Sequence, residues 1–181
     1  MAIISNIDEI NKILRNCLIT QSQISDPKRV LNALSVYGDE LHRRISNSSV
    51  YTSYEPDDVF ILFELNTDQS ANNVSFNEDE DDDIVYQRSF NFRVMIYGSD
   101  SMNVSSKLAA RLRTANVRES LLQLGIRINR VDDPDTIKEF INNTLWFRSD
   151  FDINITCEMS IEQVSTDYTM TTLNSLTDYS D

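Results

Sequence analysis

The segment from Phe151 to Glu162 alternates apolar and polar residues without a break. Because successive side chains of a strand point to opposite faces, this alternation predicts one strand with a buried face and an exposed face. Strands with one solvated face are typical of antiparallel sheets. The residues expected to point inward are Phe151, Ile153, Ile155, Cys157, Met159 and Ile161.

Two further strands are predicted as a hairpin with a long loop. The first, DDVFILFELN, carries apolar residues at odd and even positions alike, which predicts burial of both its faces. Residues 67–83 are rich in Asn and Asp and are expected to form the loop. The return strand ends at Gly98 and places four apolar residues on one face: Phe90, Phe92, Val94 and Ile96.

Helices are predicted from caps and from apolar residues at steps of three and four. Ser5 is expected to cap a first helix, Asp26 and Pro27 to start a second that runs to Ile45, and residues 101–124 to form a third. Pro134 is expected to begin a brief helix or turn. The short segments IRINRV and TLWFRS are expected to be strands.

The order of these elements, α-α-β-β-α-β-(α)-β-β, predicts an α+β fold in which helices pack on an antiparallel or mixed sheet. We expect a single domain over residues 1–164, with a helical part at 1–47 and the sheet and central helix at 58–164. Residues 165–181 lack a sustained period and are expected to form a flexible arm.

The charge of the chain is strongly negative and unevenly distributed. A net charge of −13 argues against binding to duplex DNA through a broad basic face. Between Glu55 and Asp83 there are eleven acids and no Lys or Arg, whereas residues 101–130 hold six basic residues and one acid. This asymmetry is compatible with solvated faces and with self-association between unlike patches.

The densest charge is an unbroken acidic run: Glu78, Asp79, Glu80, Asp81, Asp82 and Asp83. The run has neither the Gly nor the spacing of an EF-hand loop, so the sequence indicates no metal site. A solvated loop and a loop that faces a basic partner or a DNA channel both remain open. The candidate partner is a basic set on the predicted central helix, which is itself usually a solvated face: Lys107, Arg111, Arg113 and Arg118.

No catalytic residues are identified. The single histidine, His42, has no Ser or Cys motif to support a triad, and three glycines cannot build a phosphate loop. Cys17 and Cys157 lie on apolar faces and are expected to be small core residues. Trp146 and Arg148 share one face of a strand, and we interpret them as a structural pair.

The cysteines form no CxxC motif and no secretory signal is evident, which predicts a reduced cytoplasmic setting. No run reaches the roughly 18 apolar residues of a membrane span, so we expect a soluble protein.

The sequence resembles the tail-terminator and neck-terminator (tail-completion) proteins of tailed bacteriophages over about residues 25–164. The likeness is carried by YQRSFNFRVMIYG leading into the helix Lys107–Leu122, then Gly125-Ile126, then LWFRSDFDINI. In the last segment Trp146, Arg148 and Asp152 resemble a Trp-x-x-Arg-like segment of neck terminators, although the spacing here is Trp-x-Arg.

The resemblance implies a structural virion protein rather than an enzyme, without a cofactor. It implies a hexameric ring at the head–tail neck that ends the tail tube, docks on the head–tail connector and leaves a channel through which DNA passes without specific binding. Such a protein is assembled in the host cytoplasm and contacts no membrane. A generic acidic interaction domain, a DNA-mimicking inhibitor and, ranked last, a small hydrolase or nuclease with carboxylate-bound metal remain as alternatives.

Overall fold

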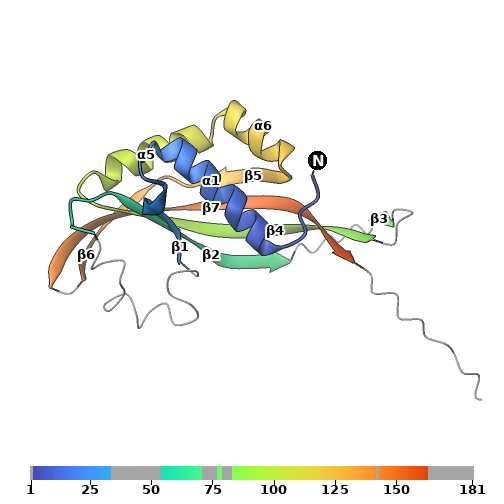
Figure 1. Cartoon of the computed structure of the whole chain (residues 1–181), viewed down its shortest axis with the longest axis horizontal. Helices are drawn as coiled ribbons and strands as arrows, with labels where there is room; N and C mark the ends of the chain where they lie inside the picture. The colour runs from blue at the N-terminus through green and yellow to red at the C-terminus, as the bar shows by residue number, and fades with distance from the viewer. Residues whose placement is uncertain (1, 34–53, 71–76, 79–82, 142, 163–181) are drawn as a thin grey trace, which may run out of the picture.

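The computed structural model describes residues 2–33, 54–70, 77–78, 83–141 and 143–162. In these residues a curved mixed sheet carries three α-helices on one face (Figure 1). The helices are α1 (Ile7–Ser22), α5 (Ser101–Leu112) and α6 (Ala115–Gln123), with a 3-10 turn at Pro27–Arg29. The strands are β1 (Val30–Asn32), β2 (Phe60–Ser70), β3 (Asn77–Glu78), β4 (Asp83–Tyr97), β5 (Ile126–Val131), β6 (Asp135–Ile141) and β7 (Thr144–Glu162). The predicted α+β class is confirmed.

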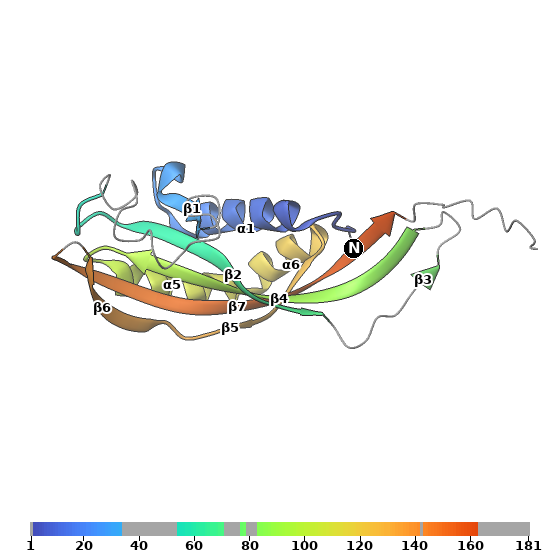
Figure 2. The ribbon, with the colours of Figure 1, turned by 90° about the horizontal axis from the view of Figure 1, so that it is seen from below.

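Two long antiparallel strands, β4 and β7, form the spine of the sheet. They pair from Asp83 opposite Glu162 to Tyr97 opposite Arg148. The strand order is β1-β2-β4-β7-β5, and β3 pairs with β4 while β6 pairs with β7. All of these pairs are antiparallel except β1 with β2. β3 and β6 lie at opposite ends of the sheet (Figure 2).

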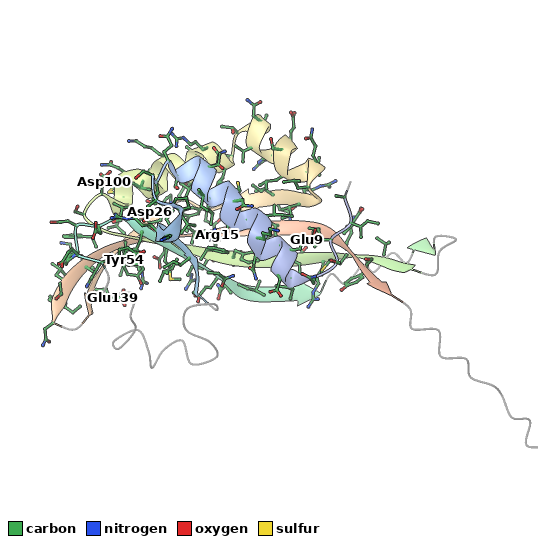
Figure 3. The ribbon with its side chains drawn as sticks, in the orientation of Figure 1. Glu9, Arg15, Asp26, Tyr54, Asp100 and Glu139 are labelled. Atoms are coloured by element: carbon green, nitrogen blue, oxygen red, sulfur yellow. The ribbon has the colours of Figure 1, made fainter. Side chains whose placement is uncertain are left out.

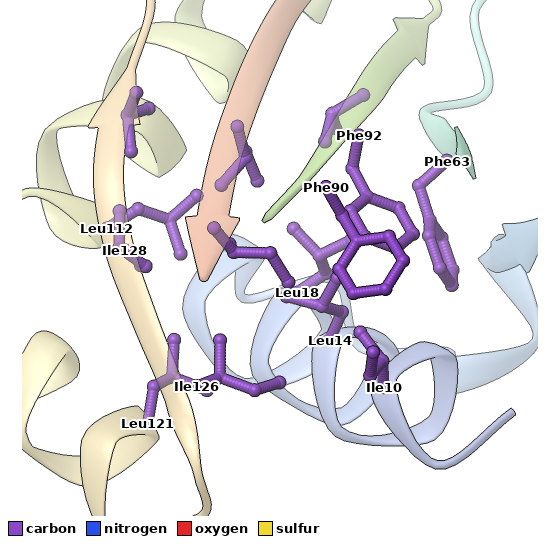
Figure 4. Close-up of a cluster of buried hydrophobic side chains, with 14 of the residues drawn as sticks. Ile10, Leu14, Leu18, Phe63, Phe90, Phe92, Leu112, Leu121, Ile126 and Ile128 are labelled. Atoms are coloured by element: carbon purple, nitrogen blue, oxygen red, sulfur yellow. The ribbon is translucent and has the colours of Figure 1, made fainter. Parts of the chain in front are cut away.

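The main core lies between the helices and the sheet (Figure 4). The N-cap of α1 is Asn6, whose side chain accepts a hydrogen bond from the amide of Glu9, while Ser5 donates to the Glu9 carboxylate. The expected cap, Ser5, is therefore one residue too early. The helices contribute Ile10, Leu14, Leu18, Leu108, Leu112 and Leu121, which pack on Phe63, Phe90, Phe92, Ile126 and Ile128 of the sheet.

A second, smaller core occupies the opposite face of the sheet. It consists of Ala33, Phe60, Leu62, Met95, Tyr97 and Trp146. The ring of Phe60 stacks on Tyr54 at 4.7 Å and on Tyr97 at 4.9 Å between centroids. Alternate residues of β2 therefore enter different cores, which confirms that this strand is buried on both faces.

The alternation of β7 is also confirmed. Phe151, Ile153, Ile155, Cys157 and Met159 are buried, and the residues between them are partly exposed. The side chain of Ile161 lies outside the described residues. The segments TLWFRS and FDINITCEMSIE, expected as separate strands, form one strand of 19 residues because β4 pairs with both.

The expected helix from Pro27 is wrong in its first turn. Asp26 does cap the amide of Lys28, but only a three-residue 3-10 turn follows. Val30 then enters β1 and pairs with Ile61, and the guanidinium of Arg15 on α1 holds the carbonyls of Pro27 and Val30 (Figure 3). Asp26 therefore caps the turn as expected, but the pairing of residues 30–32 with β2 decides the structure that follows. The rest of this expected helix, at residues 34–45, lies outside the described residues.

The single helix expected over residues 101–124 is two helices. Thr114 is extended, and its hydroxyl donates to the carbonyl of Arg111 at 2.7 Å. Because of this break, the buried positions of α6 do not continue the period of those in α5. Leu121 is therefore buried, whereas Ala115 and Leu122 are exposed.

Two loop assignments are also corrected. The residues after Pro134 form strand β6, because β-branched and aromatic residues there pair with β7 around a turn in which Asn143 has φ 62°. The loop expected at 67–83 is shorter, since β2 continues to Ser70 and pairs with β4 as far as Arg88. The expected C-terminal arm, residues 165–181, lies outside the described residues.

Candidate assembly surfaces

The two ends of the acidic run are fixed to the sheet. Glu78 belongs to β3 and pairs with Ile84, and Asp83 begins β4 opposite Glu162. Asp79, Glu80, Asp81 and Asp82 lie outside the described residues. The run therefore starts and ends at the end of the β4–β7 spine where Asp83 is opposite Glu162 (Figure 2).

The basic residues of the central helices separate into two groups. Arg111 donates to the carbonyl of Gln21 at 2.5 Å and ties α5 to the end of α1. Arg113 donates to the carbonyl of Val131 at 3.0 Å and pairs with Asp133 at 2.6 Å. Both guanidinium groups thus make contacts within the chain, although Arg113, like Lys107 and Arg118, is exposed.

Trp146 and Arg148 lie side by side on the face of β7 opposite the helices. Trp146 is 3% exposed and meets the rings of Phe60 and Tyr97 edge-on at 5.9 and 6.3 Å. Arg148 stands over the ring of Tyr97 at 5.8 Å rather than over Trp146.

Arg148 also joins three strands, through two ion pairs and a hydrogen bond. Its guanidinium lies 2.7 Å from Glu139 of β6, labelled in Figure 3, and 2.9 Å from Asp150 of β7. It donates to the hydroxyl of Tyr97 on β4 at 3.4 Å. Burial opposes the charge of Arg148, but Tyr97, Asp150 and Glu139 raise its pKa. Burial also raises the pKa of Asp150 against the opposing effect of Arg148. We name Tyr97, Glu139, Arg148 and Asp150 the Arg148 cluster.

The acids on the exposed face of the sheet are mostly paired with arginines. Asp152 binds Arg93 at 3.3 Å and accepts from Asn91, and Asp132 binds Arg130 at 2.6 Å. Within the described residues, no three or more His, Cys, Asp or Glu side chains gather as they would around a metal ion. This part of the sheet therefore provides a hydrogen-bonded polar surface, not a continuous negative face.

The two cysteines have the character of core residues. Cys157 is fully buried and Cys17 is partly buried. Burial raises the pKa of the Cys17 thiol to about 11, which makes it a weak nucleophile at neutral pH. His42 lies outside the described residues.

One exposed apolar surface was missed by the sequence analysis. Phe140 on β6 is 75% exposed, and Leu145 and Phe147 on β7 are each 36% exposed. Phe140 is opposite Leu145, and Lys138 is opposite Phe147, so these side chains share one face of the β6–β7 hairpin. We call Phe140, Leu145 and Phe147 the hairpin patch. Two segments with several β-branched and aromatic residues, separated by Asn142-Asn143, were the available signal for this hairpin.

A second surface missed by the sequence analysis is a groove between α1 and α6. Its cavity volume is about 660 Å³. The apolar residues along it are Ala2, Ile13, Cys17, Val117, Leu121 and Leu124. Glu9, Lys12, Asn116 and Ser120 contribute polar groups, and Leu124 is 50% exposed. We call it the α1–α6 groove.

The three helices in the described part of the chain are all too short or too polar to cross a bilayer.

A comparison with curated proteins gave no match. A family model described as phage neck terminator protein matches residues 8–178, which is nearly the whole chain. The elements that this match spans include both long strands, all three helices and the Arg148 cluster. The chain therefore belongs to the phage neck terminator protein family, and its role is structural, at the neck of a tailed phage.

Proposed function

We propose that this protein forms a hexameric ring at the head–tail neck, where it ends the tail tube, docks on the connector and leaves a channel for DNA. Membership in the neck terminator family carries this proposal. A protein that ends a tube works by occupying its last layer, so its function requires repeated contacts between copies and no reacting group. The partners in this arrangement are other copies of the chain, the tail-tube protein and the head–tail connector.

The distribution of charge supports contact between unlike surfaces of neighbouring copies. The acidic run starts and ends at the tip of the β4–β7 spine, whereas Lys107 and Arg118 are exposed on α5 and α6. If the tip of one copy meets the helices of the next, the contact is head-to-tail and repeats until the ring closes. An acidic run that instead faces the channel would repel DNA phosphates, so that DNA slides through.

The DNA-mimic alternative fits the structure less well. A mimic needs unpaired acids along a whole face, comparable to the phosphates of a duplex. The acids on the described sheet face are instead neutralised by arginines, as in the pairs Arg93–Asp152 and Arg148–Asp150. These paired acids do not form the row of unpaired charges that a mimic requires.

Reversing the exposed basic residues tests the charged contact. The variant Lys107→Glu/Arg118→Glu is expected to weaken ring assembly at low salt with little change in the unfolding midpoint, because both side chains are exposed. The matched control is Lys28→Glu/Arg127→Glu, which makes the same change in net charge at two other exposed sites. Light scattering gives the assembled mass. Equal assembly of both variants would contradict a contact through Lys107 and Arg118.

A further inference from the structure

The hairpin patch and the α1–α6 groove are both exposed apolar surfaces. β6, which carries Phe140, and α6, which lines the groove, lie well apart in Figure 1. We propose that the hairpin patch of one copy inserts into the α1–α6 groove of the next copy. This inference rests on the proposed ring, and it identifies an apolar contact within it that is separate from the charged contact.

The hairpin patch has the properties of an inserting element. Phe140 is 75% exposed, and an aromatic side chain can bury about 150–250 Å² of surface when it is covered. The opposite face of the hairpin is held in place by Trp146 in the second core and by the contact of Arg148 with Glu139. The patch is therefore presented on a fixed support, so that little conformational freedom is lost when it binds.

The α1–α6 groove has the properties of a receiving element. Its volume of about 660 Å³ lies within the range of about 300–1,000 Å³ seen for pockets that enclose apolar groups. Leu121 lies deep in it and is 3% exposed, while Leu124 is 50% exposed at the surface. The groove therefore offers an apolar interior with a partly open rim.

The two surfaces cannot meet within one chain. Phe140 of β6 is opposite Leu145, near the start of β7. α6 packs on β5, and the first residue of β5, Ile126, is opposite Cys157 of β7. At about 3.3 Å per residue, these two positions on β7 are about 40 Å apart. A protruding patch and a groove at separate places on identical chains give a head-to-tail contact, which is the type that closes rings.

Charge also favours this contact. Lys138 lies beside Phe140 on the same face of the hairpin, opposite Phe147, with its ammonium 5.7 Å from the centre of that ring. Glu9 and Lys12 both line the groove. Lys138 and Glu9 have opposite signs, so a docking in which Lys138 faces Glu9 rather than Lys12 brings complementary groups together at the rim of the contact.

Cross-linking between introduced cysteines tests the proposal. The double variant Lys138→Cys/Asn116→Cys places one thiol on the hairpin and one on the groove, in a Cys17→Ala background that removes the thiol inside the groove. The reaction uses a short bis-maleimide on the protein alone and on the protein mixed with tail-tube protein. A ladder of covalent oligomers is expected from the double variant, and a variant with only one of the two introduced cysteines is expected to give no covalent oligomer, because the remaining Cys157 is buried.

The apolar requirement is tested by a matched pair of substitutions. Leu124→Gln changes a residue of the groove, whereas Leu122→Gln changes a partly exposed leucine that does not line it. Phe140→Ser removes the centre of the hairpin patch. We expect Phe140→Ser and Leu124→Gln to reduce the yield of the ladder at least tenfold, and Leu122→Gln to change it less than twofold.

The outcomes separate this inference from the proposed function. A ring of the expected mass without a ladder from the double variant would overturn the inference and leave the ring standing, with the groove open to another occupant. Dimers from Lys138→Cys alone would show hairpins meeting each other, which also overturns it. A monomer with and without tail-tube protein, and no ladder, would contradict the proposed ring itself.

Discussion

Replacing Arg148 by Met should destabilise the fold by about 3 kcal/mol at neutral pH. The guanidinium is 18% exposed and contacts Glu139 and Asp150, which are 28% and 12% exposed. Removing one partner of a buried ion pair costs about 3–5 kcal/mol, because the remaining charge is left without compensation. We expect the lower end of that range because the cluster is partly open to water.

The loss should depend on pH in a defined direction. Burial already raises the pKa of Asp150 above its ordinary value of 3.8, and Arg148 lowers it. Without Arg148 this pKa rises further. A carboxyl whose folded-state pKa is raised adds stability below its unfolded-state pKa, and this stability is lost as the pH rises through the folded-state pKa. The deficit of Arg148→Met should therefore be small near pH 4 and full near pH 7.5.

Denaturant unfolding of the variant and the parent at these two pH values measures the effect. The double variant Arg148→Met/Asp150→Asn should recover part of the loss at pH 7.5, because it removes one uncompensated carboxylate. A deficit below about 1 kcal/mol at pH 7.5 would refute the assignment of Arg148 as the charge that holds the hairpin. An equal deficit at both pH values would refute the role given to Asp150.

Two other predictions concern the fold. Gly98→Ala should cost at least about 2 kcal/mol in denaturant unfolding, because Gly98 has φ +113° and an added Cβ would lie 2.6 Å from the carbonyl oxygen of Asp58; stability equal to the parent would show that this turn can relax. Cys17 should react slowly with a thiol reagent at pH 8, since its pKa is raised to about 11. Because its pKa is raised, its contribution to stability is present below pH 9 and should fall by about 1–2 kcal/mol as the pH rises to 11, relative to Cys17→Ser; rapid labelling at pH 8 would contradict burial of the thiol.

The long strands could be predicted from sequence because the pattern of apolar residues in each one matches the faces that are buried. The alternation from Phe151 to Met159 and the two-sided apolar character of Phe60–Phe63 both correspond to buried faces. A one-residue shift of register would place these side chains in water, so the pattern fixes the structure.

The errors came from local signals that longer-range pairing overrides. Pro27 and Pro134 each follow an acid, as at many helix starts, but pairing of the following residues with β2 and β7 draws both segments into the sheet. The helix break at Thr114 depends on a side-chain bond to the carbonyl of Arg111, for which the apolar period gives no signal.

The assembly surfaces were even harder to predict from the sequence. Arg111 and Arg113 were named with Lys107 and Arg118 as candidate assembly residues, yet the structure engages the first two in contacts with Gln21, Val131 and Asp133. The hairpin patch depends on β6 being a strand, and the α1–α6 groove depends on how two distant helices pack. Neither can be read from the periodicity of a single segment.

The mass of the purified protein in solution, with and without tail-tube protein, tests the central claim most directly. Light scattering combined with negative-stain imaging is expected to show a closed ring of six 20.9-kDa chains, about 125 kDa, either unaided or on the end of the tube. A monomer of 20.9 kDa under both conditions would contradict the ring and favour an acidic interaction domain without self-assembly.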